Sequence, residues 1–173
     1  PDSVRASLVA KLFANRWLLT GISQDIFGIE YAAVMKNIYS IGAGISHGLG
    51  YGDNFLAVLL ANSAGEMRRF VEAISPAERD ITDAAYLGDL LVTGYSQFSR
   101  NRTLGFMIGK GYTVRNALLE MTMVAEGYYA ASCIHEVTKK KKISVPIAET
   151  IYRILYNESP AAREIRDLTK ILK

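Results

Sequence analysis

The sequence predicts an all-α fold, in which a compact multi-helix domain is organised around two long central helices. Apolar residues recur at helical spacing through most of the 173 residues, and no series of alternating strands is found. Proline and short polar residues stand where the helices would begin. A chain of this length can bury a sizeable core without a disulfide or metal, so we expect residues 1–173 to form one domain.

The first helix is expected over Val4–Phe13, with Asp2 and Ser3 as possible caps. After it, Trp17–Ile22 is a short apolar stretch containing a glycine. This stretch could be one isolated strand or an extended connector. A lone strand makes no sheet, so neither alternative changes the fold class.

The two long helices are expected in succession. From Ile26 to Ile45 nearly every position is apolar or small, which is typical of a helix buried on all sides. The glycine-rich segment 48–52 ends it, and Asp53 or Asn54 can cap a second helix that continues to residue 74. The two helices therefore form a hairpin.

The rest of the chain is predicted to form a polar surface loop and then short helices. The loop is Ser75–Thr82, with room for one helical turn. The short helices are expected at Asp89–Gly94, Arg100–Lys110, Val114–Met121, Gly127–Lys140, Pro146–Tyr156 and Pro160–Leu172.

Charge and hydropathy exclude several classes of protein. The net charge of +3 is too small to argue for a nucleic-acid partner, although it suits a small anionic ligand. The longest uncharged run, 37–52, is shorter than the roughly 18 residues of a membrane span. The single cysteine, Cys133, fits a reducing cytoplasmic compartment. Because the chain lacks an initiator methionine and a signal core, we expect it to be part of something longer.

Lys36 is the first candidate for chemistry. Its helical neighbours at three, four and seven positions are apolar or small, which predicts a half-buried amine. Burial disfavours the charged form and suits an amine to proton transfer. The alternative is a lysine whose ammonium group reaches the surface. Asn37 beside it adds an amide that can bind a hydroxyl.

Asp89 is expected at a helix start, with Thr93 one turn later on the same side. An aspartate there is most simply a helix cap. Together with a buried lysine, it becomes a candidate charge partner for Lys36.

The tetrapeptide Ser99-Arg100-Asn101-Arg102 is the most informative segment. Ser99 is a natural N-cap, yet the first turn carries two arginines where the helix dipole favours acids. Two cations and free backbone N–H groups at a helix start suit a bound phosphate. The alternative is two solvated surface arginines.

Other chemical candidates are weaker. Gly48-x-Gly50-x-Gly52 joins two helices and is read as a turn, and His47 beside it is read as structural. Cys133, His135 and Glu136 do not converge on one metal at helical spacing, so no metal site is expected. The run Lys139–Lys142 is read as a solvated helix end.

Taken in order, these motifs form a family pattern. They are Lys36-Asn37-Ile38-Tyr39, Gly48-Leu49-Gly50-Tyr51-Gly52-Asp53-Asn54, Gly88-Asp89-Leu90-Leu91-Val92-Thr93, Ser99-Arg100-Asn101-Arg102 with Gly105, Glu126-Gly127, Pro146-Ile147 and Ile154-Leu155-Tyr156. From Pro1 to about Leu172 the chain closely resembles the C-terminal domain of bacterial-type NAD(P)-dependent glycerol-3-phosphate dehydrogenases. It departs from the family in segment 83–87, which is usually richer in glycine, and at His47, where an acid is common.

The resemblance implies a helical substrate domain like that of 6-phosphogluconate dehydrogenase, with its N-terminal Rossmann domain absent from this chain. It implies hydride transfer between NAD or NADP and dihydroxyacetone phosphate, giving sn-glycerol 3-phosphate for phospholipid synthesis. The coenzyme would be bound mainly by the missing domain, so the chain alone is expected to be inactive.

The resemblance also assigns roles to individual residues. Lys36 would be the catalytic proton carrier and Asp89 its neighbour. Substrate-binding residues would be Lys36, Asn37, Asp89, Thr93, Ser99, Arg100 and Asn101. Coenzyme-binding residues would be Arg100, Val124 and Glu126.

Two other functions remain open from the residues themselves. One is a helical dimerisation or interaction module without chemistry, which the buried-helix pattern equally allows. The other is a related dehydrogenase domain that acts on a different 2-hydroxy substrate. Saturable binding of glycerol 3-phosphate would favour the dehydrogenase over the interaction module. Loss of the preference for a phosphorylated substrate would indicate the related dehydrogenase. A homodimer is compatible with each function.

Overall fold

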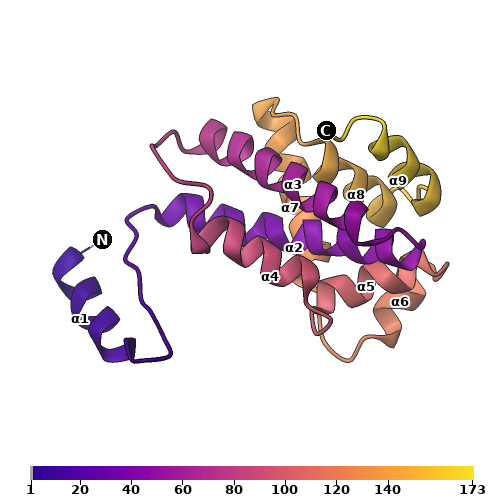
Figure 1. Cartoon of the computed structure of the whole chain (residues 1–173). Coiled ribbons are helices and arrows are strands. Elements are labelled where there is room, and N and C mark those ends of the chain that lie inside the picture. Colours follow the sequence, from indigo (N-terminus) through magenta and orange to yellow (C-terminus); the bar gives the residue numbers. More distant parts are fainter. Residues whose placement is uncertain (1) are drawn as a thin grey trace.

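The computed structural model describes residues 2–173, and in this part of the chain all regular elements are helices. The elements are α1 (Ser3–Phe13), α2 (Ile26–Gly48), α3 (Asp53–Ile74), the π-helix η1 (Ala84–Gly88), α4 (Asp89–Tyr95), α5 (Arg100–Gly109), α6 (Val114–Glu120), α7 (Glu126–Lys141), α8 (Pro146–Tyr156) and α9 (Ala161–Thr169). The predicted all-α class and the long α2–α3 hairpin are confirmed (Figure 1).

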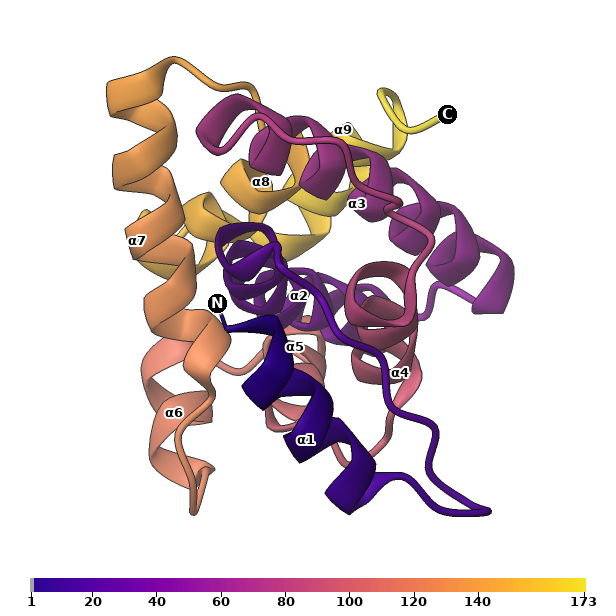
Figure 2. The ribbon, with the colours of Figure 1, turned by 90° about the vertical axis from the view of Figure 1, so that its left-hand side faces the viewer.

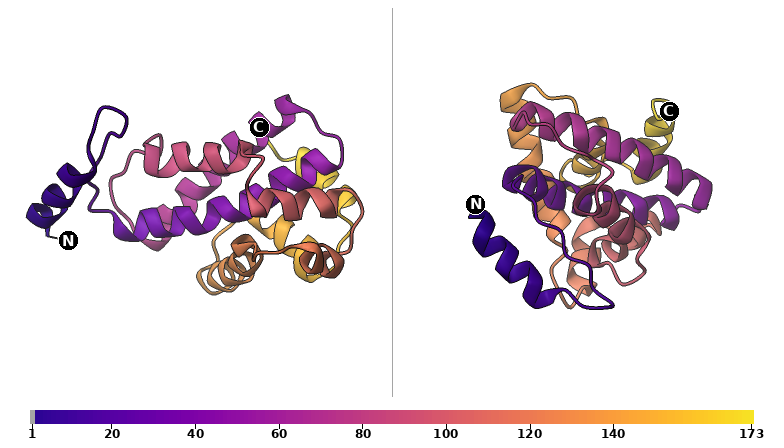
Figure 3. Two further views of the ribbon diagram at one scale, coloured as in Figure 1. Left: turned by 90° about the horizontal axis from the view of Figure 1, so that it is seen from below. Right: turned by 60° about the vertical axis from the view of Figure 1, so that its left-hand side comes forward.

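Helix α2 is the centre of the molecule, with α3, α4, α5, α7 and α8 packed around it (Figure 2). Met35, Ile38 and Ile41 on α2 are fully buried. The prediction of burial on all sides is wrong for the first turn, where Ile26 is 50% and Phe27 66% exposed. This end of α2 extends toward α1 (Figure 3), and it is covered on one side only, where Gly28 is buried near Tyr86 of η1.

Helices α2 and α5 approach each other backbone to backbone. Gly44 and Gly48 of α2 lie against Gly105 and Gly109 of α5. A Cβ atom on any of the four would overlap backbone atoms of the opposite helix. The glycines recur at i and i+4, so each pair lies on one face of its helix. This contact fixes the start of α5 beside the middle of α2.

A buried carboxylate joins α3 to α8. Glu66 is fully buried and accepts hydrogen bonds from the backbone nitrogens of Ile147 and Ala148 at 2.8 and 2.9 Å. The Tyr39 hydroxyl donates to the same carboxylate at 3.2 Å. Burial raises the pKa of Glu66 to about 7, although these hydrogen bonds oppose the rise. The start of α8 is thereby capped from a distant part of the chain.

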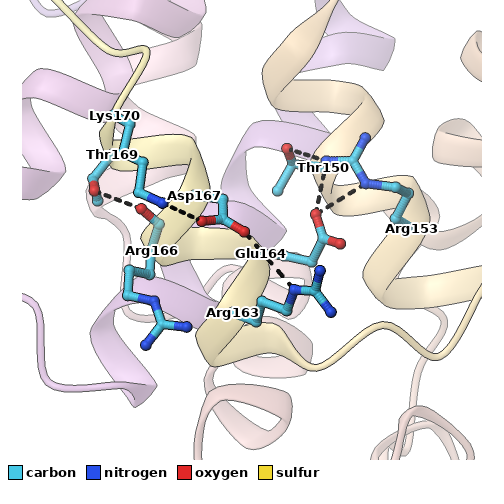
Figure 4. A network of polar contacts seen from close by, with 8 residues as sticks. All are labelled: Thr150, Arg153, Arg163, Glu164, Arg166, Asp167, Thr169 and Lys170. Atoms are coloured by element: carbon cyan, nitrogen blue, oxygen red, sulfur yellow. Dashed lines mark hydrogen bonds and ion pairs between the residues drawn. The ribbon is translucent and has the colours of Figure 1, made fainter.

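The last two helices are tied together by a polar network (Figure 4). The Arg153 guanidinium on α8 donates to Glu164 on α9 through Nε at 2.9 Å and Nη2 at 2.7 Å. Nη2 also donates to the Thr150 hydroxyl at 3.0 Å. These bonds hold α9 against the body of the domain.

The N-terminal segment stands apart from the body. Within Ser3–Phe13 no residue is buried, and Figures 1 and 3 show α1 beyond the end of the bundle. The stretch Trp17–Ile22 is a connector without regular structure, and it begins in a tight turn that is closed by an isolated bridge between Asn15 and Leu18. Leu19, with 95% of its surface exposed, shows how little of this apolar segment is covered.

The expected surface loop Ser75–Thr82 contains an inward-facing arginine. Only 3% of the Arg79 side chain is exposed, and its Nε donates to Asp25 at 2.6 Å. The carboxylate of Asp25 also accepts from the Tyr86 hydroxyl and the Gly28 nitrogen. The loop itself is confirmed, because residues 75–82 form no helix or strand. Its expected surface position is wrong for the Arg79 side chain, whose burial the ion pair compensates.

Candidate active site

Lys36 and Asp89 form an ion pair between α2 and α4. The Lys36 Nζ lies 2.6 Å from Oδ1 and 2.5 Å from Oδ2 of Asp89. The side chains are 21% and 37% exposed, so the pair is partly desolvated but reachable. The expected half-buried amine and its charge partner are therefore both present. A single carboxylate holds the amine from one side.

Asp89 is not a helix cap, contrary to the simplest expectation for it. Gly88 before it has helical angles, with φ −58° and ψ −50°, and makes no capping bond. The backbone passes without a break from η1 into α4, because the π-helical turn continues directly into α-helical hydrogen bonding. The Asp89 carboxylate is thus free to pair with Lys36. Thr93, one turn later, is half-buried on the same helix.

The start of α5 is positively charged and lacks acids. Ser99 caps it by accepting from the Arg102 nitrogen at 3.3 Å, and the first turn of the described helix Arg100–Gly109 holds no acidic residue. The backbone N–H groups of Arg100 and Asn101 have no intrahelical acceptors at this position. The Arg100 side chain is 44% exposed, and its Nη2 is 3.9 Å from Glu126. This turn can receive an anion.

The two arginines of this turn do not act together. Arg102 donates through Nη1 to the Tyr95 carbonyl at 2.5 Å, and its Nη2 lies 3.4 Å from His47 Nδ1. The Arg102 guanidinium therefore contacts the last residue of α4 and the His47 ring. The expectation that both arginines face one anion is therefore wrong for Arg102, and Arg100 stays the candidate.

A chain of side-chain amides joins α2, α5 and α7. Asn101, which is 8% exposed, accepts from the Gly127 nitrogen at 2.9 Å and donates to Asn37 Oδ1 at 3.0 Å. Asn37 in turn donates to the Ala33 carbonyl at 3.1 Å. Each amide group keeps one further N–H for a ligand. A Cβ at Gly127 would lie 2.5 Å from the Asn37 carbonyl oxygen, so only glycine fits there.

The predicted coenzyme-side residues lie on an open edge of this region. Val124 precedes α7 and is 57% exposed. Glu126 begins α7 and is 68% exposed, facing the Arg100 guanidinium. These side chains are accessible to a large ligand laid across the start of α7. They surround no enclosed space.

Two hollows of the described surface lie away from these residues. One of about 440 Å³ lies between the end of α7 and the start of α8, and another of about 810 Å³ lies between the α5–α6 turn and the α8–α9 turn. Neither is lined by any predicted site residue. The side chains of Lys36 and Asp89 are themselves 21% and 37% exposed, so this pair lies on an accessible face of the domain.

Residues 2–173 carry neither a metal-binding cluster nor a membrane-spanning helix. This part of the chain holds no cluster of His, Cys, Asp and Glu suited to a metal ion. His135 instead pairs with Glu149 at 2.9 Å and stacks on Tyr152, with ring centroids 3.8 Å apart. No helix in the same residues combines the length and apolar character of a bilayer span.

Comparison with known proteins gives consistent results. Residues 25–166 match the family described as NAD-dependent glycerol-3-phosphate dehydrogenase C-terminus. Glycerol-3-phosphate dehydrogenases [NAD(P)+] of Staphylococcus haemolyticus and Chlorobium chlorochromatii are 35% and 36% identical, over 96% and 97% of this chain. The chain spans about half the length of these relatives, 50% of each.

Solved structures agree with the sequence relatives. The crystal structure of glycerol-3-phosphate dehydrogenase from Coxiella burnetii matches 97% of this chain and 52% of its own, with a TM-score of 0.92 and 28% identity. The structure of DsGPDH of Dunaliella salina matches 95% of this chain and 30% of its own, with a TM-score of 0.84 and 28% identity. With the family match over residues 25–166, these similarities show that the chain belongs to the NAD-dependent glycerol-3-phosphate dehydrogenase C-terminal family.

Proposed function

We propose that this chain is the substrate-binding and catalytic half of an NAD(P)-dependent glycerol-3-phosphate dehydrogenase, which interconverts dihydroxyacetone phosphate and sn-glycerol 3-phosphate. One observation carries the proposal: the Lys36–Asp89 pair lies beside the acid-free start of α5. A hydrogen bond between Asn37 and Asn101 joins these two features. Asn37 follows Lys36 in α2, and Asn101 follows Arg100 in α5. A proton donor thus stands near an anion site.

Lys36 would move the proton in this reaction. In the reducing direction its ammonium gives a proton to the C2 carbonyl oxygen of dihydroxyacetone phosphate, and the neutral amine takes it back in the reverse direction. Asp89 holds the amine on the α4 side by its two short contacts. A nicotinamide coenzyme, when bound, supplies or accepts the hydride at C2.

Arg100 and the first N–H groups of α5 would hold the substrate phosphate. A guanidinium forms charge-assisted hydrogen bonds with phosphate, and the positive end of the helix dipole adds to the attraction. The free N–H groups of the Asn37 and Asn101 amides are placed for the substrate hydroxyls and carbonyl. Thr93 on α4 would line the same pocket.

The coenzyme would lie along Arg100, Val124 and Glu126. Their side chains are exposed on one edge, as a shared binding surface requires. The choice between NAD and NADP would rest with a nucleotide-binding half, which the length of the relatives suggests as the partner. The open face at Lys36 and the uncovered apolar surface of α1 and Trp17–Ile22 suit contact with that half.

The same proposal sets the cellular role. We place the enzyme in the cytoplasm, where sn-glycerol 3-phosphate would serve phospholipid synthesis. The helical unit over 1–173 would be the substrate domain of the longer protein, with a homodimer as a further possible level of assembly. A purely helical interaction module would not require the Lys36–Asp89 pair.

Two measurements test the function. Titration of the chain with glycerol 3-phosphate should shift the backbone amide resonances of Arg100 and Asn101 saturably, whereas glycerol should not. Joined to the nucleotide-binding half of a relative, the chain should oxidise NADH or NADPH with dihydroxyacetone phosphate, and alone it should not. An unresponsive amide spectrum together with an inactive, folded fusion would contradict the proposal.

A further inference from the structure

A buried hydroxyl on α2 connects the two halves of the candidate site. Ser40 lies one helical turn after Lys36 and is fully buried. Its Oγ donates to the Thr93 carbonyl of α4 at 3.1 Å and lies 2.9 Å from the Oγ of Ser99, the cap of α5. The Ser40 Oγ atom on α2 thus contacts both α4 and the cap of α5.

The direction of these hydrogen bonds follows from counting protons. A serine hydroxyl has one proton, and Ser40 gives its proton to the Thr93 carbonyl, which can only accept. Ser99 must therefore donate to Ser40. Because Ser99 also accepts from the Arg102 nitrogen, its only proton and one lone pair are used within the protein.

This count changes the role expected of Ser99. A phosphate dianion needs donors, and the Ser99 hydroxyl has no proton left to offer it. The donors available at this helix start are the Arg100 guanidinium and the N–H groups of Arg100 and Asn101. Ser99 supports these donors by fixing the helix that carries them.

We propose that Ser40 is a positioning residue, which sets the start of α5 at its distance from the Lys36–Asp89 pair through Ser99 and the Thr93 carbonyl. The inference rests on the proposed function, because it concerns the distance between the proton donor and the phosphate site. Removing the hydroxyl leaves the charged groups in place. It frees the α5 cap and the α4 carbonyl to shift relative to α2.

Ser46 offers a matched control on the same helix. It is 1% exposed, and its Oγ donates at 2.9 Å to the Gly42 carbonyl, within α2 itself. Ser40→Ala and Ser46→Ala therefore each remove one buried hydroxyl from α2, but only Ser40→Ala removes a bond to the site helices. The pair separates positioning from general stability.

The experiment measures steady-state kinetics and thermal midpoints of both variants in the full-length enzyme. We expect similar decreases in midpoint for the two variants. Ser40→Ala should raise KM for dihydroxyacetone phosphate by about 3- to 10-fold, which corresponds to the contribution of one ordinary hydrogen bond to substrate binding, with a smaller change in kcat. Ser46→Ala should leave both constants near those of the wild type.

A double variant distinguishes action through Ser99 from a direct effect. If Ser40 acts through the α5 cap, Ser40→Ala and Ser99→Ala together should raise KM little more than Ser99→Ala alone. Additive effects, or a KM for Ser40→Ala equal to that of Ser46→Ala, would overturn the positioning role. An inactive wild-type enzyme would instead refute the proposed function, so the two failures are distinguishable.

Discussion

Two ion pairs connect α2 to the segment that follows α3, and they differ in how many hydrogen bonds their carboxylates receive. At the N-terminal end, the Asp25 carboxylate receives hydrogen bonds from Arg79, Tyr86 and Gly28, and its arginine partner is 3% exposed. Near the middle, the only hydrogen bonds that Asp89 receives from described side chains come from Lys36, and both groups are partly exposed.

This difference indicates that the Asp25–Arg79 pair is structural, whereas the Lys36–Asp89 pair is suited to proton transfer. The guanidinium hydrogen bonds from Arg79 hold the pKa of Asp25 well below its usual range. Burial and the Asp25 carboxylate raise the pKa of Tyr86 to about 12, so its hydroxyl stays a donor. This cluster has no proton to exchange at neutral pH. The Lys36 amine has donors left over, and these can be turned toward a substrate oxygen.

The largest effect is expected from Lys36→Met in the full-length enzyme. Methionine keeps an unbranched apolar stem but cannot carry a proton, so kcat should fall by roughly 10²–10⁴-fold. The free energy of unfolding should change by no more than about 1 kcal/mol, because a partly buried charge is also removed. Kinetics and denaturation of the same preparation check both statements. Near-native turnover in a folded variant would exclude Lys36 as the proton carrier.

The opposite pattern is expected at the structural pair. Asp25→Asn keeps the shape and the cap of α2 but leaves the Arg79 guanidinium buried without a counter-charge, which should cost about 3 kcal/mol of unfolding free energy. Denaturant unfolding at pH 7 measures it. The matched variant Asp89→Asn should cost about 1 kcal/mol or less, since that pair is more exposed. Equal losses in the two variants would remove the distinction drawn between the pairs.

Arg100→Ala tests the phosphate end of the site. Losing a charge-assisted contact should weaken substrate binding by roughly 1.5–3 kcal/mol, seen as a higher KM in the full-length enzyme. Arg100→Lys should restore binding only in part, because lysine lacks the planar fork. Arg102→Ala is the control within the same turn, since its guanidinium is committed to Tyr95 and His47. A KM unchanged in Arg100→Ala would identify this arginine as a surface charge.

The smallest effect concerns Glu66, whose carboxylate accepts hydrogen bonds from two backbone nitrogens and the Tyr39 hydroxyl and is stabilised in its charged form by Arg69. Its folded pKa, about 7, lies above the ordinary value of 4.5, so the folded state binds more protons between these values. Stability should therefore fall as pH rises from about 4.5 to 7, by an amount on the order of 1–3 kcal/mol. Asp25 has the opposite sign, and its contribution is lost as pH falls below its unfolded value of 3.8.

Unfolding of wild type and Glu66→Gln across this pH range checks the Glu66 contribution. Glutamine cannot titrate, so the difference between the two stabilities should change with pH and level off above about pH 7. The Asp25 contribution lies at lower pH and is common to both proteins. A difference that stays constant from pH 4.5 to 7 would contradict the raised pKa.

The sequence predicted the helices better than the contacts between them. The α2–α3 hairpin and the Lys36–Asp89 pair follow from helical spacing and from an unusual lysine on an apolar face. The partnership of Asp25 with Arg79 does not, because the residues are 54 positions apart and no local pattern places a loop arginine inward. The same holds for Ser40, whose importance depends on helix ends 53 and 59 residues away.

Local rules also failed where a tertiary feature overrode them. Asp89 has the residue type of a cap, but the π-helix before it supplies helical backbone up to Gly88. Arg102 was expected beside Arg100, but the carbonyl of Tyr95 and the His47 ring engage it instead. In each case the competing partner comes from a neighbouring helix or turn that spacing alone does not locate.

The glycine contact between α2 and α5 has a consequence for how this domain can be altered by mutation. Gly44 and Gly105 bring backbone against backbone, so at these glycines no side chain lies between the helices that could be enlarged or trimmed to retune their spacing. Substitutions there can only push the helices apart. Altered substrate preference should therefore arise through α4 and α7, whose side chains border the same region. For directed evolution, libraries at Thr93 and Val124 are better starting points than libraries at the glycines where α2 and α5 meet.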